Sequence, residues 1–263
     1  MADYNIFFSW QVDSAENTNR TFIRKALDDA AAEIALEINV IDVPRITSGM
    51  EGIAGSPEVA SVMFEKIDDS AIFVGDTTLV GVILDADGKV KKRVPNPNVS
   101  LEMGYAAATL GWHRVICVMN EWEYTRHEQP FDTRNRRFPI DYTLSPEMAA
   151  VTETRRKIRT GLKSWLKKAI VDIEQSELLK VDKARERMDV RCLELAYILG
   201  GADYFSEPKP ESGFPMEGSV FNATVIRLLE IGLLRAHSNP AEHLYAYHWT
   251  YLGIKALRSM GIR

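Results

Sequence analysis

Short apolar segments alternate with amphipathic helical segments throughout the first half of the chain. Ile6–Phe8, Ala71–Val74 and Arg114–Met119 are apolar runs bounded by polar residues, which is typical of strands buried on both faces. Between the first two runs, apolar residues recur at helical spacing after Thr18 and Asn19, both favourable N-caps. Strands that alternate with helices tend to pair in parallel. The pattern therefore predicts an α/β fold with helices on both faces of a parallel sheet.

Further segments continue this alternation as far as residue 142. In chain order they are a strand at Ile38–Val43, a helix opening at Ser56-Pro57-Glu58, a hairpin of Leu79–Leu84 and Val90–Val94, a helix from near Asn98 to near Gly111, and a strand at Phe138–Tyr142. The hairpin prediction depends on Asp87-Gly88, because this dipeptide favours the turns that join antiparallel strands.

Several polar residues end or directly follow the predicted strands. They are Ser9, Trp10, Gln11, Asp42 and Asp76. In open parallel sheets, ligands bind beyond the carboxyl ends of the strands. These residues are therefore candidates for a binding site.

Glu102 is the only charged residue between Asn96 and Trp112. Apolar residues at most positions around it predict a largely buried helix, and Gly104 with three alanines would allow a neighbouring backbone or a ligand to approach closely. A lone buried carboxylate is costly unless it is paired or used. Two interpretations stay open: a structural Glu bound to an arginine or a loop, and a carboxylate at a nucleotide or sugar site.

Length and composition place the chain among globular proteins. Its 263 residues suffice for about two domains, and 46% are hydrophobic and 26% charged. No apolar run approaches the ~18–20 residues of a membrane span, and no signal peptide is visible. Cys117 and Cys192 lie in apolar stretches and are predicted to be buried reduced thiols of a cytoplasmic protein, without a disulfide.

Other chemical signals are weak. Gly49–Gly52 lacks the lysine and the spacing of a phosphate-binding loop, and no Gly-x-Ser-x-Gly motif is present. The five histidines show no metal-ligand spacing with the cysteines, so no metal site is expected. Arg134, Arg136 and Arg137 fit either a phosphate contact or a solvated cluster, and Trp10 fits either base stacking or a structural role.

The charge differs between the two parts of the chain. Residues 1–150 carry 14 basic and 23 acidic side chains, a net charge of −9, whereas residues 151–263 carry 18 and 14, a net charge of +4. Much of the positive excess falls within Arg155–Lys168. A split of this kind favours two modules with different surroundings.

The C-terminal part is predicted to be mainly helical. Pro146 can start a helix, and helical spacing runs through Arg155–Leu179, with Trp165 on the same stripe as its aliphatic residues. The later elements are helices at Asp189–Leu199 and Ser219–Ile231, strands at Leu233–Ala236 and Leu244–Trp249, and a last helix from Thr250 through Met260; a loop spans Ser206–Gly218. This order resembles a winged helix-turn-helix. The expected organisation is an α/β domain at residues 1–145, a connector helix at 146–180 and a winged-helix-like domain at 181–263.

A winged helix often binds DNA through its second helix. Here that helix offers Asn222, Thr224 and Arg227, but it also carries Glu230 and has no basic cluster. DNA binding is therefore possible but not favoured over a role in protein interaction, oligomerisation or sensing. A membrane-surface role for the connector helix is also not favoured.

Four segments of the first half resemble bacterial TIR-like (Toll/interleukin-1 receptor-like) domains. They are Ile6–Gln11, Gly55–Val59, Ile72–Thr78 and Asn98–Ala106, and Pro130–Pro139 is similar to a segment of TIR-like nucleotide-binding proteins. The last two of these four segments, Ile72–Thr78 and Asn98–Ala106, are also similar to nucleoside 2-deoxyribosyltransferases. The resemblance covers about residues 4–145 and implies a flavodoxin-like fold.

The resemblance also implies an activity. Catalytic TIR domains cleave the nicotinamide–ribose bond of NAD with a glutamate on the helix after the third strand, and Glu102 occupies that position. Ser9, Trp10, Gln11 and Asp76 would line the site, and Asn98 and Tyr105 would contact substrate. NAD would be the substrate, and no cofactor is implied. The resemblance further implies self-association through the loop Pro44–Gly55 and a role in bacterial anti-phage defence or signalling.

One departure from the family leaves other functions open. Asn-Val-Ser-Leu-Glu stands where eukaryotic TIR domains carry their usual pattern around the glutamate. Two alternatives therefore remain beside NAD hydrolysis. One is a non-enzymatic nucleotide sensor that signals through the winged-helix-like domain, and the other is a deoxyribosyltransferase-like enzyme.

Overall fold

The computed structural model describes residues 4–37, 44–49, 59–130, 139–199, 201, 202, 204–206, 208, 213–239 and 244–262. The chain divides into two compact units, residues 1–173 and residues 174–263. The division falls inside the long helix that the sequence predicts as a connector.

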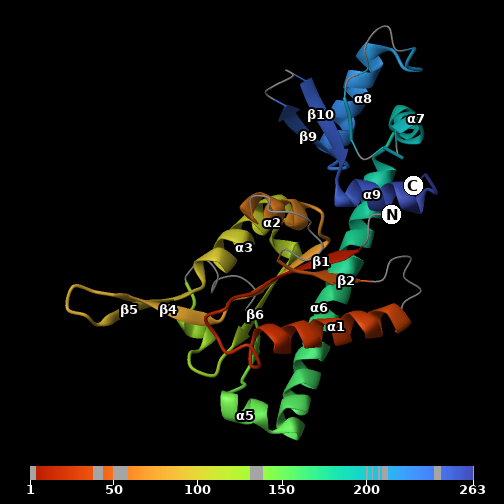
Figure 1. Ribbon diagram of the computed structural model, residues 1–263. Coiled ribbons are helices and arrows are strands. Elements are labelled where there is room, and N and C mark those ends of the chain that lie inside the picture. The colour runs from red at the N-terminus through yellow and green to blue at the C-terminus, as the bar shows by residue number, and fades with distance from the viewer. Residues whose placement is uncertain are drawn as a thin grey trace. The chain divides into compact units, whose positions relative to one another are not determined.

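A five-stranded parallel sheet forms the centre of the first unit (Figure 1). Its strands are β1 (Asn5–Ser9), β2 (Arg45–Thr47), β3 (Ile72–Asp76), β6 (Val115–Asn120) and β7 (Ile140–Tyr142). Their order is β2-β1-β3-β6-β7, and every neighbouring pair is parallel. This is the flavodoxin-like order, so the α/β prediction is confirmed.

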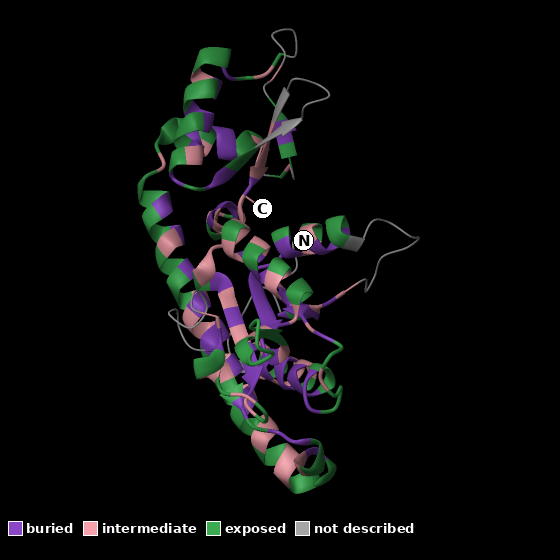
Figure 2. Cartoon of the chain, turned by 90° about the vertical axis from the view of Figure 1, so that its left-hand side faces the viewer, coloured by how far each residue is buried: buried purple, intermediate pink, exposed green. Residues whose placement is uncertain are grey.

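Helices cover both faces of this sheet. They are α1 (Arg20–Glu37), α2 (Val59–Asp68), α3 (Pro97–Thr109), α5 (Pro146–Ala150) and the first part of α6 (Thr152–Glu186). Phe7 and Phe73 point to the face that α2 and α3 cover, where they pack with Met63 and Met103. Figure 2 shows the buried residues concentrated in the strands and on one side of the helices. The apolar stripe predicted for α1 is buried as expected.

A hairpin leaves the sheet between β3 and α3. Its strands are β4 (Leu79–Leu84) and β5 (Val90–Pro95), and they pair with each other as a two-stranded sheet. Gly88 lies at the turn with φ +77°, a conformation that glycine adopts without strain. Short 3₁₀ turns at Trp112–Arg114 and Arg126–Glu128 flank β6.

The second unit has its own apolar core. It contains the end of α6, α7 (Val190–Leu199), β8 (Tyr204–Ser206), α8 (Gly218–Glu230), β9 (Leu234–Asn239), β10 (Leu244–Trp249) and α9 (Tyr251–Ser259). The three strands form an antiparallel sheet of order β8-β10-β9. Helix, helix, hairpin and helix follow one another as predicted. Gly232, with φ +77°, ends α8.

Two strands differ from the predictions. Arg45–Thr47, assigned to a loop by the sequence, forms β2 because Ile46 is buried beside β1. Tyr204–Ser206 forms β8, which pairs with β10 and buries Phe205 among the rings of Phe221 and Trp249. Several predictions lie outside the described residues: Ile38–Val43 (with Asp42), residues 50–55 of the loop Pro44–Gly55, Ser56–Glu58, Arg134, Arg136 and Arg137.

Burial corrects four further expectations. Helix α3 is buried on one face only, since Leu101 is 61% exposed. A side chain at Gly104 would meet open space, so close packing does not require this glycine. Trp165 is exposed on α6, and Cys117 is only half-buried. Both cysteines are free.

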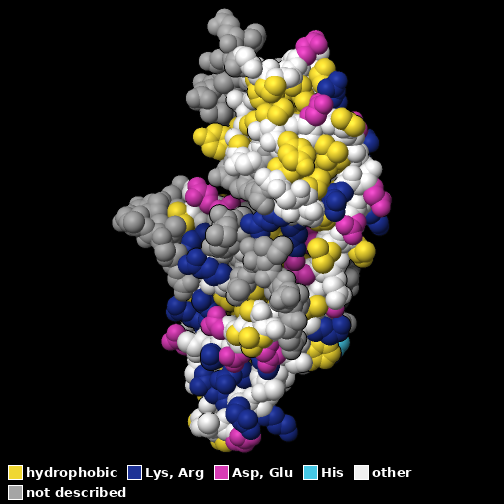
Figure 3. Space-filling model, turned by 90° about the vertical axis from the view of Figure 1, so that its right-hand side faces the viewer, with side chains coloured by type: hydrophobic (Ala, Val, Ile, Leu, Met, Phe, Trp, Pro, Cys, Tyr) yellow, Lys and Arg dark blue, Asp and Glu magenta, His cyan; other side chains and the backbone are white. Residues whose placement is uncertain are grey.

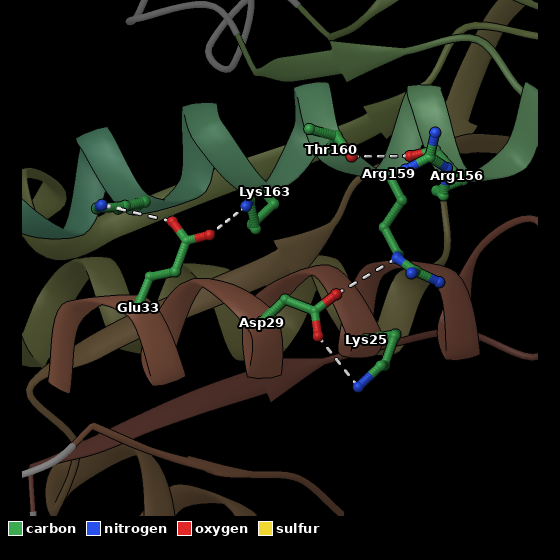
Figure 4. Close-up of polar contacts among 8 residues, drawn as sticks. Lys25, Asp29, Glu33, Arg156, Arg159, Thr160 and Lys163 are labelled. Carbon is green, nitrogen blue, oxygen red and sulfur yellow. Dashed lines mark hydrogen bonds and ion pairs between the residues drawn. The ribbon is translucent and has the colours of Figure 1, made fainter. Parts of the chain in front are cut away.

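Ion pairs join α1 to α6 within the first unit. Figure 4 shows Glu33 of α1 facing Lys163, and Asp29 between Lys25 and Arg159. Lys167 also pairs with Glu33. The hydrogen bond and charge of Lys163 lower the pKa of the Glu33 carboxyl. Figure 3 shows acidic and basic side chains interspersed on one face of the molecule. The basic excess near Arg155–Lys168 is thus partly neutralised by acidic residues of the first unit.

Candidate functional site at the carboxyl edge of the sheet

A buried polar network lies where β1, β3 and β6 end. Asn19 Nδ2 donates to Asp76 Oδ2 at 3.1 Å and to Thr78 Oγ1 at 2.9 Å. The Thr78 hydroxyl in turn donates to Asp76 Oδ1 at 2.6 Å, and the Thr78 N–H donates to the same oxygen at 3.1 Å. The Asp76 carboxylate therefore orients two side chains from different parts of the chain.

The network extends to the ends of β6 and β7. The Asn120 N–H donates to Thr78 Oγ1, and the Asn120 side chain donates to Leu144 O and accepts from Leu144 N. The Tyr142 hydroxyl donates to Thr18 O at 2.7 Å. These bonds hold the loops after four strands in one arrangement, and buried networks of this kind rigidify a site when their groups are satisfied.

Asp76 has no exposed surface. Burial raises the pKa of the Asp76 carboxyl, while hydrogen bonds from Thr78 and Asn19 oppose the rise. Burial and the nearby Asp76 charge also raise the pKa of Tyr142. Asp76 is fully buried at the carboxyl edge of the sheet. It is therefore better placed to hold Asn19 and Thr78 than to contact a ligand directly.

Glu102 lies on α3 beside the end of β1, within reach of Ser9. Burial raises the pKa of the Glu102 carboxyl, and the Ser9 hydroxyl opposes this by hydrogen bonding to the charged form. None of the described residues forms an ion pair with Glu102. The structural interpretation expected an arginine partner, and no arginine among the described residues takes that role. Glu102 as a whole is half-buried.

Two buried side-chain oxygen atoms lie at the end of β1 and in the loop that follows it. Ser9 Oγ makes no other hydrogen bond, and its geometry toward Glu102 falls short of a regular one. Gln11 donates from Nε2 to Thr78 O at 3.2 Å, which leaves Oε1 buried without a donor. Buried polar atoms are normally paired, so these two need an explanation such as a ligand or water.

The N-terminus of α3 is tied to the loop after β1. Asn96 caps the helix by accepting from Asn98 N and Val99 N, and its Nδ2 donates to Asp13 Oδ2 at 2.5 Å. Asn98 is exposed on the first turn. This cap places the start of α3 next to the β1–α1 loop and so brings Glu102 toward the carboxyl edge.

Two of the candidate residues face other elements. Tyr105 donates its hydroxyl to Asp68 Oδ2 at 2.7 Å and stacks on Phe64, so it joins α3 to α2. Trp10 is half-buried, and the Arg20 guanidinium lies 3.6 Å above its ring. The structure thus brings Ser9 close to Glu102, whereas Gln11 joins the network of Thr78 and Asp76. Tyr105 and one face of Trp10 contact other residues, Asp68 and Phe64 for Tyr105 and Arg20 for Trp10.

The sequence analysis missed a pocket at the same edge. Its wall includes Asp13, Trp122, Glu123 and Tyr124, and Asn19, Thr78 and Asn120 of the network also line it. The signal was present in the sequence, because Asn120–Tyr124 directly follows the strand at Arg114–Met119, as Ser9–Gln11 follows the first.

Helix α8 in the second unit presents few free polar groups. Thr224 is buried and donates to Val220 O, while Arg227 pairs with Glu230 and donates to Arg187 O. The predicted preference against DNA binding stays a prediction, and these contacts are in keeping with it.

Comparison with known protein families finds none whose model matches this chain, and no curated protein matches it. Among the described residues, no three His, Cys, Asp or Glu side chains are grouped closely enough to hold a metal ion. Within the same residues, every helix is too short or too polar to cross a membrane.

Proposed function

We propose that the first unit binds NAD at the carboxyl edge of its sheet and hydrolyses the nicotinamide–ribose bond with the help of Glu102. The observation that carries the proposal is the half-buried Glu102 carboxylate beside Ser9, at the edge where flavodoxin-like sheets bind ligands. The resemblance of Asn98–Ala106 to the catalytic segment of TIR-like domains supports the same residue.

The chemistry needs a carboxylate at this position. As the bond between the ribose carbon and the nicotinamide nitrogen breaks, nicotinamide leaves with the electron pair and positive charge develops on the ribose. The ionised Glu102 stabilises that charge, and partial burial strengthens the interaction because fewer water molecules screen it. Water then adds to the ribose carbon and loses a proton, which yields ADP-ribose and nicotinamide.

Release of nicotinamide from NAD by the purified chain tests the proposal. Glu102→Gln keeps the shape of the side chain but removes its charge, so we expect the rate to fall by at least about 100-fold, as when a group that stabilises transition-state charge is lost. Glu65→Gln makes the same chemical change on the exposed face of α2 and should leave the rate unchanged. Undiminished activity in Glu102→Gln would refute the catalytic role.

A second candidate is a nucleotide sensor without turnover that acts through the winged-helix-like unit. The buried acceptors Ser9 Oγ and Gln11 Oε1 favour it, because they would serve binding equally well without any reaction. Calorimetry with NAD distinguishes the two functions. Heat of binding with no nicotinamide release, in wild type and Glu102→Gln alike, is the result expected of a sensor.

A further inference from the structure

The pocket at the carboxyl edge is shaped by three loops of the first unit. It lies among the segments that follow β1, β3 and β6, and its volume is about 170 Å³. Pockets for drug-sized ligands hold about 300–1,000 Å³. This pocket therefore suits one ring system with part of an attached sugar, and it is too small for a whole dinucleotide.

Trp122 offers the pocket an aromatic surface. Its side chain is 47% exposed, although its backbone N–H is fixed by Asn120 Oδ1. The neighbouring Tyr124 has the Arg93 guanidinium 3.8 Å from its ring centre, so one of its faces is already covered. An exposed indole at the rim of a pocket is a stacking surface for a planar ring.

The charged groups in the wall are acidic. Asp13 and Glu123 line the pocket, and no lysine, arginine or histidine is among its described lining residues. Carboxylates accept hydrogen bonds from ring N–H, exocyclic amino and sugar hydroxyl groups, whereas they repel phosphate. The acidic wall therefore favours binding of a base and ribose and disfavours binding of a phosphate group.

The floor of the pocket is held in place. Asn19 and Thr78 are buried and bound to Asp76, and Asn120 is bound to Thr78 and Leu144. A site built on such a network loses little conformational freedom when a ligand binds, which favours affinity.

From these features we infer that the pocket binds a purine nucleoside through its base and ribose, with Trp122 stacked on the base and with Asp13 and Glu123 accepting from its donors. The inference goes beyond the proposed function, since it needs neither Glu102 nor NAD cleavage. The pocket is a second binding site at the same edge, and the ligands that it recognises are purine nucleosides.

Calorimetric titration of the full chain with adenosine and with guanosine tests the inference. We expect at least one of them to bind, and Trp122→Ala to weaken that binding by about tenfold, within the range for loss of one stacked base. Trp122→Phe, which keeps an aromatic ring, should stay within about threefold of wild type. Trp165→Ala removes another exposed indole, from α6, and should leave the affinity unchanged.

Three results would overturn the inference. They are failure of both nucleosides to bind the wild-type chain, equal affinity in Trp122→Ala, and displacement of the nucleoside by inorganic phosphate. Glu123→Gln should weaken binding as well, because the charged acceptor becomes neutral. Glu102→Gln should bind the nucleoside as wild type does. Undiminished nicotinamide release in Glu102→Gln, with nucleoside binding as in wild type, would therefore contradict the proposed function alone.

Discussion

The pairing of Ser9 with Glu102 shows how the site depends on single residues. Burial makes the ionised carboxylate less stable, and the nearby Ser9 hydroxyl offsets part of that loss, although the two groups form no regular hydrogen bond. The two residues are far apart in the sequence and meet only because α3 packs across the end of β1. Glu102 could be recognised from the sequence as the one charge in an apolar segment, and Ser9 as the residue that ends the first strand. Only the resemblance to TIR-like domains placed the two residues at one site.

Ser9→Ala is expected to raise the pKa of the Glu102 carboxyl further above its ordinary value. The reason is that the variant keeps the burial, which raises the pKa, and removes the hydroxyl, which lowers it. NMR titration of the side-chain carboxyl carbon of Glu102 measures the change without any need for activity.

Ser100→Ala is the matched control for Ser9→Ala. Its hydroxyl also lies near the start of α3, but it donates to Asn96 O. The Glu102 titration should be the same in this variant as in wild type. An unchanged or lowered Glu102 pKa in Ser9→Ala would show that the hydroxyl does not stabilise the carboxylate.

Other single residues show why burial is harder to predict than element type. The apolar residues of α3 predicted a largely buried helix, yet Leu101 is exposed and Tyr105 binds Asp68. A mostly apolar helix can still have an open face, because the neighbours that cover it are set by the whole fold. The same reason explains the exposed Trp165.

At the scale of elements, hydrophobic periodicity identified the helices and strands whose own sequence shows a clear apolar pattern. Helix α1 and the strands β1, β3 and β6 appear close to their predicted bounds, since long apolar stripes and buried runs are local properties. The three-residue strands β2 and β8 were missed, because such short segments become strands only when a neighbour supplies their hydrogen bonds.

Helix α9 contains a position that only glycine can occupy. A Cβ atom at Gly253 would overlap the backbone carbonyl oxygen of Leu233, and the backbone cannot move aside as a flexible side chain can. Gly253→Ala should therefore lower the free energy of unfolding of the second unit by at least about 2 kcal/mol. Thermal or urea unfolding of the full chain measures the loss.

Gly104→Ala provides the contrast within α3. Its added methyl group meets open space, and alanine is a better helix former than glycine. The variant should be neutral or more stable by up to about 1 kcal/mol. If both glycine variants lost stability equally, the overlap at Leu233 would not be the cause of the loss in Gly253→Ala.

At the scale of the whole molecule, the charge split has a structural counterpart. The acidic first part and the basic stretch of α6 meet within one unit, where Asp29 and Glu33 pair with Arg159, Lys163 and Lys167. The sequence showed the imbalance but not this pairing. Exposed pairs contribute little individually, so their main effect is to match α6 to the acidic surface of α1.

The buried network links that unit's stability to pH through Asp76. Burial raises the pKa of Asp76 above 3.8 in the folded chain, so its stabilising contribution is complete below that pH and is lost as the pH rises through the folded pKa. Asp76→Asn removes this titration. As the pH rises from about 4 to neutrality, the wild type should therefore lose stability relative to the variant. The free energy of unfolding of the variant minus that of the wild type becomes more positive over this range. Urea denaturation at several pH values, followed by tryptophan fluorescence, measures it. A difference that is constant with pH, or that moves toward wild type, would contradict the burial of an ionisable Asp76.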